Sequence, residues 1–304
     1  LELVKTFLMR VLRYSNVLFT GSFTIWIANG MAGVVRATGH MFIAALFLGL
    51  GSFFQVILGG VFIFGLGPIQ SMGISGSSFS IVIGNGFAAV CILFFLIFKC
   101  ETLKLRLSTR FIDLRSITLI VKQGSLASIN AFCTWGSVVV ITSYMTNFGV
   151  QTLAGYGIGA RLEFLIIPVV FGFGAASTAL IGINIGSNKL KRASNIGWVA
   201  TLYSAMAAGL IGFGAYFYPG FWSNAFTSDQ SAQVACKIYL ETVGPFYIFF
   251  ASGLCLYFAS QGAGKVLWPA IAAIIRFLII LIGSISISKN PTVSIDEYFS
   301  LVSI

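Results

Sequence analysis

The chain is poor in charged residues and lacks any long polar stretch. Only 9% of its 304 residues are charged, whereas 58% are hydrophobic. A soluble protein of this length needs far more charge to cover its surface, so the composition excludes a soluble fold. The longest polar stretch, at about 99–117, is too short for a soluble domain. The sequence therefore predicts a membrane protein.

Histidine, acidic residues and paired cysteines are also scarce. One histidine and eight acidic residues form no histidine cluster and no pair of carboxylates, which makes an integral-membrane enzyme the least favoured class. The five cysteines lack paired spacing and are interpreted as small packing residues. Two glycine motifs, at 262–265 and 172–177, lack key residues of nucleotide-binding loops. We therefore predict no cofactor and no metal, and an ion gradient or a partner as the energy source.

Apolar runs of about 20 residues recur along the whole chain, and each is long enough to cross a hydrocarbon core of roughly 30 Å. Their continuous apolar character favours helices over a β-barrel. We predict an all-α polytopic membrane bundle. Its eight helices lie at about 14–37, 42–65, 75–98, 118–146, 155–184, 193–217, 236–262 and 268–288.

The net charge of +10 is concentrated in alternate loops. Eleven basic residues fall on one side of the predicted helices, whereas the opposite loops, about 66–74, 147–154 and 218–235, have none. The positive-inside rule places the basic side in the cytoplasm of a multi-pass inner (cell) membrane protein. This placement argues against nucleic acid as a partner and makes the lipid bilayer the partner. The basic residues before the first helix fall on the other side and are interpreted as part of an interfacial amphipathic stretch.

Residues 21–39 and 244–262 are one segment written twice, at an offset of 223. Six of nineteen positions are identical, among them Gly21 with Gly244 and Ala28 with Ala251. A repeat of this length implies two related halves. The copies are the first and seventh predicted helices. Because an even number separates them, the halves have the same orientation and form parallel repeats.

The same repeat suggests that the chain belongs to a longer protein. About 120 residues with three helices precede the second copy, whereas almost nothing precedes the first. We therefore expect a parent of two six-helix halves, with three further helices before residue 1 and one helix cut at the end. A cleaved signal peptide is the alternative explanation for a chain that starts with Leu1.

Several motifs resemble a known transporter family. The run Gly155-Tyr-Gly-Ile-Gly-Ala-Arg-Leu-Glu163 is followed by Pro168, by 172–176 and by 182–186, and the whole resembles the eighth helix of the MATE (multidrug and toxin extrusion) family. Residues 62–68 and 73–76 resemble that family's turn between helices five and six. The resemblance covers nearly the whole chain, from the family's fourth helix to its eleventh.

The resemblance implies a fold of two pseudo-symmetric six-helix lobes. On this basis 1–98 is the C-terminal half of the N-lobe, 99–117 is a basic cytoplasmic loop between the lobes, and 118–304 is most of the C-lobe. It also implies a monomeric secondary antiporter that exports small-molecule organic cations, drugs or toxins in exchange for H⁺ or Na⁺.

The chain departs from the family where many prokaryotic members carry their cation site. The Asn and Asp of the fifth helix correspond here to Gln55 and Gly59. The glutamate of the seventh helix in the sodium-coupled branch has no counterpart, since this region contains Asn130 and no acidic residue. The coupling ion therefore cannot be assigned from the resemblance.

Only two acidic residues, Glu163 and Glu241, lie within predicted helices. Glu163 lies about eight residues into its helix, where an unpaired carboxylate costs several kcal/mol. It is our candidate ion-coupling residue; the alternative is a structural partner for a basic residue. Of the two intramembrane basic residues, Arg161 points elsewhere on the helix, so we predict a contact between Glu163 and Arg276. Glu241 lies near a helix end, where its carboxylate reaches water.

Other polar and small residues within the helices are candidates for a cavity or a hinge. Gln55, Asn130, Tyr247 and Tyr257 are substrate-cavity candidates, because polar groups among aromatic rings suit bulky cations. The alternative for each is an interhelical hydrogen bond. Pro168, Gly172 and Gly174 are hinge candidates or, alternatively, sites of close helix packing.

Three functions remain open from the sequence. The first is the antiporter, in which proton or sodium binding to one lobe biases the opening of a cleft. The second is a lipid-linked oligosaccharide flippase of the same superfamily, which would tend to carry several basic residues in its cavity. The third is a truncated transporter fragment without function.

Overall fold

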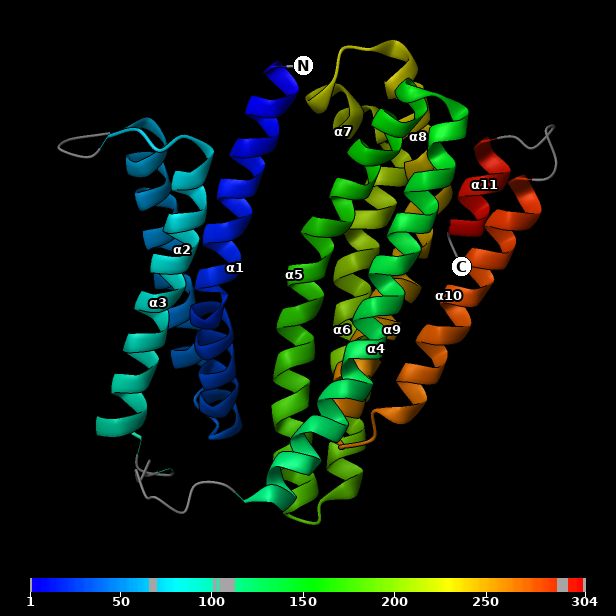
Figure 1. Cartoon of the computed structure of the whole chain (residues 1–304). Helices are drawn as coiled ribbons and strands as arrows, with labels where there is room; N and C mark the ends of the chain where they lie inside the picture. The colour runs from blue at the N-terminus through cyan, green and yellow to red at the C-terminus, as the bar shows by residue number, and fades with distance from the viewer. Residues whose placement is uncertain (1, 66–69, 101–102, 104–112, 289–294, 303–304) are drawn as a thin grey trace. The chain divides into compact units, whose positions relative to one another are not determined.

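A computed structural model describes residues 2–65, 70–100, 103, 113–288 and 295–302 (Figure 1). All regular structure within these residues is helical. The elements are α1 (Glu2–Ala37), α2 (Met41–Phe64), α3 (Ile74–Phe98), α4 (Leu114–Met145), η1 (Thr146–Phe148), α5 (Val150–Gly186), α6 (Leu190–Phe217), α7 (Pro219–Phe226), α8 (Gln230–Val243), η2 (Gly244–Phe246), α9 (Tyr247–Gly262), α10 (Leu267–Ser288) and α11 (Ile295–Val302).

Eight helical segments of the described chain are long and apolar enough to cross a membrane, which confirms the prediction of an all-α polytopic membrane protein. Large apolar side chains point outward along these segments; Phe19 and Leu210, for example, are 76% and 77% exposed. Exposed apolar surface on this scale is rare on soluble monomers and suits contact with lipid.

The chain divides into two compact units, Leu1–Phe111 and Ile112–Ile304. In unit 1, α1 and α2 both pack against α3. The contact of α2 with α3 is backbone to backbone, because a Cβ at Gly51 would lie only 2.7 Å from the carbonyl oxygen of Gly84. Small residues at such crossings let membrane helices approach closely without a side chain between them.

In unit 2, α5, α6 and α9 pack against one another, α8 packs against α5, and α10 packs against α4. The short helix α11 contacts α8 and α10 through Tyr298 and Phe299, which are both fully buried. The Tyr298 hydroxyl lies 3.1 Å from that of Ser284 in α10, and burial raises the pKa of Tyr298. Unit 2 therefore has its own aromatic core, to which α5, α8, α9 and α11 all contribute.

Several helix boundaries differ from those predicted. The first helix, expected at 14–37, begins at Glu2, so the basic residues before residue 14 belong to the same continuous helix. The helix expected at 155–184 begins at Val150, directly after Gly149, whose φ of 100° favours glycine. The helix expected at 236–262 is two helices, α8 and α9, joined by the 3₁₀ turn η2. Pro245 lies in that turn, and the break follows because proline has no N–H and its ring crowds the carbonyl four residues earlier.

The two repeated segments show the same pattern of burial. Gly21 and Gly244 are both buried, Phe23 and Phe246 are both exposed, and Ala28 and Ala251 both have no exposed surface. Side chains at matching positions also bond back along the helix in the same way, from Asn29 to the Ile25 carbonyl and from Ser252 to the Ile248 carbonyl. The sequence repeat therefore corresponds to a repeated packing face.

Candidate functional site

The candidate ion-coupling residue Glu163 lies inside α5, thirteen residues after Val150. At 1.5 Å per residue this is roughly 20 Å along the helix axis, deeper than the sequence predicted, because α5 begins five residues earlier than expected. The carboxylate is partly buried. A charge at this depth needs a partner, and the neighbouring helices supply one.

The direct partner of Glu163 is Tyr239, whose hydroxyl donates a hydrogen bond to Oε1 of the carboxylate. Tyr239 lies on α8 and is almost completely buried. Its ring packs edge-on against Tyr156 at 5.4 Å and against Phe299 at 5.1 Å between ring centres. Gly159 leaves room for the ring, because a Cβ there would overlap it. Packing therefore fixes the position of the hydroxyl that holds the carboxylate.

Tyr239 was not among the predicted site residues, although the sequence of α8 contains a signal for it. Six residues of this helix are buried at helical spacing, whereas Lys237 and Glu241 lie outside that face. The buried residues are Ala232, Ala235, Cys236, Tyr239, Leu240 and Val243. A tyrosine in the middle of such a face is expected to bring its hydroxyl to a buried partner. Which partner it meets depends on the packing of α8 against α5.

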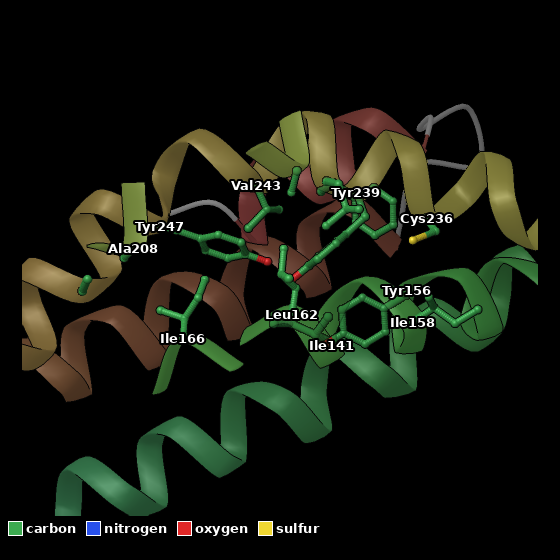
Figure 2. Close-up of a cluster of buried hydrophobic side chains, with 14 of the residues drawn as sticks. Ile141, Tyr156, Ile158, Leu162, Ile166, Ala208, Cys236, Tyr239, Val243 and Tyr247 are labelled. Carbon is green, nitrogen blue, oxygen red and sulfur yellow. The ribbon is translucent and has the colours of Figure 1, made fainter. Parts of the chain in front are cut away.

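A second tyrosine hydroxyl points to the same place. Tyr247 starts α9 and is 2% exposed, and its hydroxyl is buried without a hydrogen-bond partner among the described residues. Figure 2 shows the hydroxyl groups of Tyr247 and Tyr239 directed toward one another beside Leu162, the residue before Glu163. The structure thus brings together Glu163 and one predicted cavity residue, Tyr247. The Tyr247 hydroxyl oxygen lies between α5, α8 and α9 without a hydrogen bond to the described residues.

The predicted contact between Glu163 and Arg276 is wrong. No ion pair joins the two residues, and Nη2 of Arg276 instead donates a 2.9 Å hydrogen bond to Oγ1 of Thr134 in α4. The guanidinium lies close enough to attract the carboxylate electrostatically without touching it. Its Nε is buried and has no hydrogen-bond partner in the described part of the chain. The pairing failed because α10 packs on α4, and Thr134 is nearer.

The two other charged candidates lie on exposed faces. Arg161 is exposed, and its guanidinium carbon lies 5.5 Å from the ring centre of Phe226, a distance at which a cation and an aromatic ring attract each other. Glu241, in α8, is also exposed. Glu163 is therefore the acidic residue of the described membrane spans that is turned toward a protein partner.

The remaining cavity candidates make local or interhelical contacts. Tyr257 donates a 3.2 Å hydrogen bond to the carbonyl of Ala127, which ties α9 to α4. Asn130 is half-buried in α4, and its backbone carbonyl accepts a 2.8 Å hydrogen bond from the Thr134 hydroxyl. Gln55 lies in unit 1, where it packs against Gly84. Their role in a substrate cavity stays a prediction.

The hinge candidates differ in their surroundings. Pro168 lies within α5, where it removes one helical hydrogen bond. No described neighbouring side chain or helix lies within 4 Å of a Cβ built at Gly172, whereas a Cβ at Gly174 would overlap the ring of Phe258 in α9. Four residues on, Thr178 donates a 2.7 Å hydrogen bond to the Phe258 carbonyl. The part of α5 after Pro168 is therefore fastened to α9, and any hinge motion stays a prediction.

The site as a whole is suited to binding a proton or a small cation. One carboxylate, a hydroxyl that donates to it and a second hydroxyl without a partner offer oxygen ligands at one place. Oxygen atoms of this kind are the ligands that hard cations prefer. The basic group nearby is held by Thr134 rather than by the carboxylate, so the carboxylate is not neutralised by an ion pair.

Comparison with protein families identifies the class. Residues 127–285, more than half of the chain, match the MatE family model. The chain therefore belongs to the MATE family of membrane transporters, as the motifs at 155–186 had suggested.

Individual relatives are distant. The chain is 23% identical over 267 residues to the probable multidrug resistance protein YpnP of Bacillus subtilis, covering 88% of this chain and 59% of that protein. The probable multidrug resistance protein YoeA of the same organism is 20% identical over 265 residues, with 86% and 57% covered. A crystal structure of MATE in the straight conformation superposes with a TM-score of 0.85 at 21% identity, covering 96% of this chain and 65% of that one. The chain thus spans less than two thirds of the length of each.

Proposed function

We propose that this chain forms part of a secondary antiporter that exports organic cations, drugs or toxins in exchange for H⁺ or Na⁺, with Glu163 as the ion-coupling residue. Membership of the MATE family and the names of the two Bacillus subtilis relatives support multidrug export as the activity. The observation that carries the coupling role is a partly buried intramembrane carboxylate held by Tyr239 and not by a basic residue.

Neutralisation of Glu163 provides a physical switch. While the carboxylate is charged, it accepts the hydrogen bond from Tyr239 and attracts Arg276 through space. A proton or sodium ion on the carboxylate cancels its charge and weakens both interactions. Because α5, α8 and α10 carry these three groups, the change alters how the helices of unit 2 attract one another. An ion that binds one arrangement better than another shifts the population between them.

The basic residues favour the exporter over the oligosaccharide flippase. A flippase needs free basic groups for an anionic lipid-linked substrate. Arg161 lies against Phe226, and Arg276 donates to Thr134. Both guanidinium groups are thus already engaged within the protein in part, Arg276 through Nη2 alone.

The test uses the protein expressed from its full native gene, in cells or vesicles with an imposed proton or sodium gradient. Glu163→Gln should reduce gradient-driven efflux of a fluorescent organic cation to the background of cells without the gene. Glu241→Gln is the matched control, since Glu241 is the other intramembrane acid but is exposed, and it should retain efflux. Unchanged efflux in Glu163→Gln removes this residue from the mechanism.

Tyr239→Phe separates the role of the hydroxyl from that of the ring. The variant keeps the edge-on contacts with Tyr156 and Phe299 but loses the donor to Glu163. We expect efflux to persist with a shifted dependence on pH or sodium concentration, because a hydrogen bond to the charged form favours that form. An unaltered dependence on both ions would show that the hydroxyl does not act on the coupling group.

A further inference from the structure

The end of α5, the start of α6 and the end of α9 line an open groove of about 360 Å³ at the end of unit 2 that carries the α5–α6 and α9–α10 turns. Its walls are apolar and include Ile181, Ile185, Leu256 and Ala259. Gly197 also lines it, and an added Cβ there would sit in ordinary contact, 3.6 Å from Ile181 and 3.7 Å from Ala259. The volume falls within the range of small-molecule sites, of roughly 300 to 1,000 Å³.

The rim of this groove is polar and positively charged. Ser194, Ser260 and Lys265 line it. Lys189, Lys191 and Arg192 are exposed on the adjoining turn and at the start of α6. The two segments that form the groove, 181–198 and 256–265, contain no aspartate or glutamate. The positive charge at the rim is therefore not balanced by an acidic residue of either segment.

The position of Trp198 indicates how deep the groove lies in the membrane. This residue lines the groove and is 65% exposed, eight residues after Leu190 and hence roughly 12 Å along α6. Exposed tryptophan side chains of membrane proteins gather at the level of the lipid headgroups. The groove thus runs from the headgroup level toward the hydrocarbon, with basic residues at its outer end.

We propose that this groove binds an anionic phospholipid, with one acyl chain between α6 and α9 and the phosphate at Lys265. The apolar walls suit an acyl chain, and the serine hydroxyls and the ammonium group suit phosphate oxygens. Basic pockets between membrane helices hold anionic headgroups by the same chemistry. An organic cation is disfavoured by the like charge, and a soluble anion gains nothing from the apolar walls.

Tryptophan fluorescence in lipid vesicles tests the proposal on the full chain. The chain is reconstituted in vesicles that contain either brominated phosphatidylglycerol or brominated phosphatidylcholine at the same mole fraction, and the contribution of Trp198 is obtained by difference from Trp198→Phe. We expect brominated phosphatidylglycerol to quench Trp198 more strongly. Equal quenching by the two lipids would overturn the proposal.

Charge variants locate the effect. Lys265→Gln should weaken the preference for the anionic lipid about five-fold. Lys122→Gln is the control, since Lys122 is an exposed basic residue of α4 that does not line the groove, and it should leave the preference unchanged. Equal effects of both variants would show general surface attraction instead of a site. Far-UV circular dichroism of each variant confirms that the helices are intact.

Soluble glycerol phosphate distinguishes a lipid from a free anion as the occupant. In excess it should not relieve the quenching, because it has no acyl chain for the groove. Relief of the quenching would mean that the basic rim alone binds phosphate, and the proposal would be wrong.

Discussion

At the scale of the residue, the position of one hydroxyl depends on the absence of one methyl group. Gly159 lies beneath the ring of Tyr239, and a Cβ at this position would overlap Cδ1 of that ring. Gly157, two residues earlier on the same helix, is exposed and has no atom within 4 Å of such a Cβ. The two glycines therefore provide a matched pair of sites for substitution.

Gly159→Ala should destabilise the protein by about 1–3 kcal/mol, since overpacking forces Tyr239 to move. Gly157→Ala should be neutral or stabilising by up to about 1 kcal/mol, because alanine favours the helix. Thermal unfolding of the purified protein in detergent measures both. The same displacement draws the Tyr239 hydroxyl away from Glu163, so only Gly159→Ala should also alter efflux. Equal stability of the two variants would contradict the packing seen here.

Of the two residues joined by this hydrogen bond, the sequence identified only Glu163. Glu163 stood out because acidic residues inside apolar spans are rare. The hydrogen-bond partner of Glu163 was not predicted. Arg276 was chosen because its charge is opposite, whereas the residue that contacts Glu163 is Tyr239. The choice between them is made by which helices touch: α8 packs on α5, and α10 packs on α4. Spacing along one helix contains no information about such contacts.

At the scale of the element, the start of α4 depends on a carboxylate that is fully exposed. Asp113 accepts hydrogen bonds from the backbone N–H groups of Arg115 and Ser116, at 3.1 and 3.3 Å, and from the Ser116 hydroxyl. The Ser116 hydroxyl, followed by the Arg115 amide, lowers the pKa of Asp113 below its ordinary value near 3.8. The charged form is therefore favoured at the helix start.

The sign of the pH dependence follows from that lowered pKa. The capping contribution is complete above about pH 3.8, where the unfolded carboxylate is also charged, and it is lost as the pH falls through the lower pKa of the folded state. The protection of the first-turn amides of α4 against hydrogen exchange, measured relative to their intrinsic exchange rates at each pH, should fall in this acidic range. Asp113→Asn, which keeps an acceptor but cannot ionise, should remove the pH dependence. The same loss of protection in acid in Asp113→Asn would assign the effect to another group.

The repeated segments make a second prediction at this scale. Ala28→Leu and Ala251→Leu, at matching and fully buried positions, should each destabilise the protein by about 1–3 kcal/mol. Gly30→Ala and Gly253→Ala, at matching positions with open space, should not. Thermal unfolding compares the four. A large difference between the two alanine sites would show that the shared sequence no longer serves a shared packing role.

Helix number and several helix ends were predictable from the sequence, whereas the starts of α1, α5 and α8 were not. A run of about 20 apolar residues is a strong signal, and all eight spans were found. The polar residues Gln151 and Thr152 concealed the start of α5. In the structure Thr152 is buried, and its hydroxyl donates a hydrogen bond to the Phe148 carbonyl. Polar residues at a helix start can be satisfied by the previous turn of the chain, which is invisible in composition.

At the scale of the whole molecule, the remaining prediction is its orientation in the membrane. The turn between α5 and α6 and the turn between α9 and α10 carry Lys189 and Lys265, whereas the segment before α8 carries no basic residue. A cytoplasmic excess of lysine and arginine sets the orientation of membrane helices. The basic residues in the first part of α1, Lys5, Arg10 and Arg13, oppose this bias, so the orientation needs a direct test.

Two single cysteines decide it, in a background where the five native cysteines are replaced. Ser187→Cys lies between α5 and α6, and Ser228→Cys lies beyond α6; both positions are exposed. Because α6 spans the membrane between them, the two thiols must be on opposite sides. In intact cells a membrane-impermeant maleimide should label Ser228→Cys alone, and Ser187→Cys only after the cells are opened. The reverse pattern would place the basic turns, and with them the proposed lipid groove, in the outer leaflet, where the charge bias offers no explanation for their lysines.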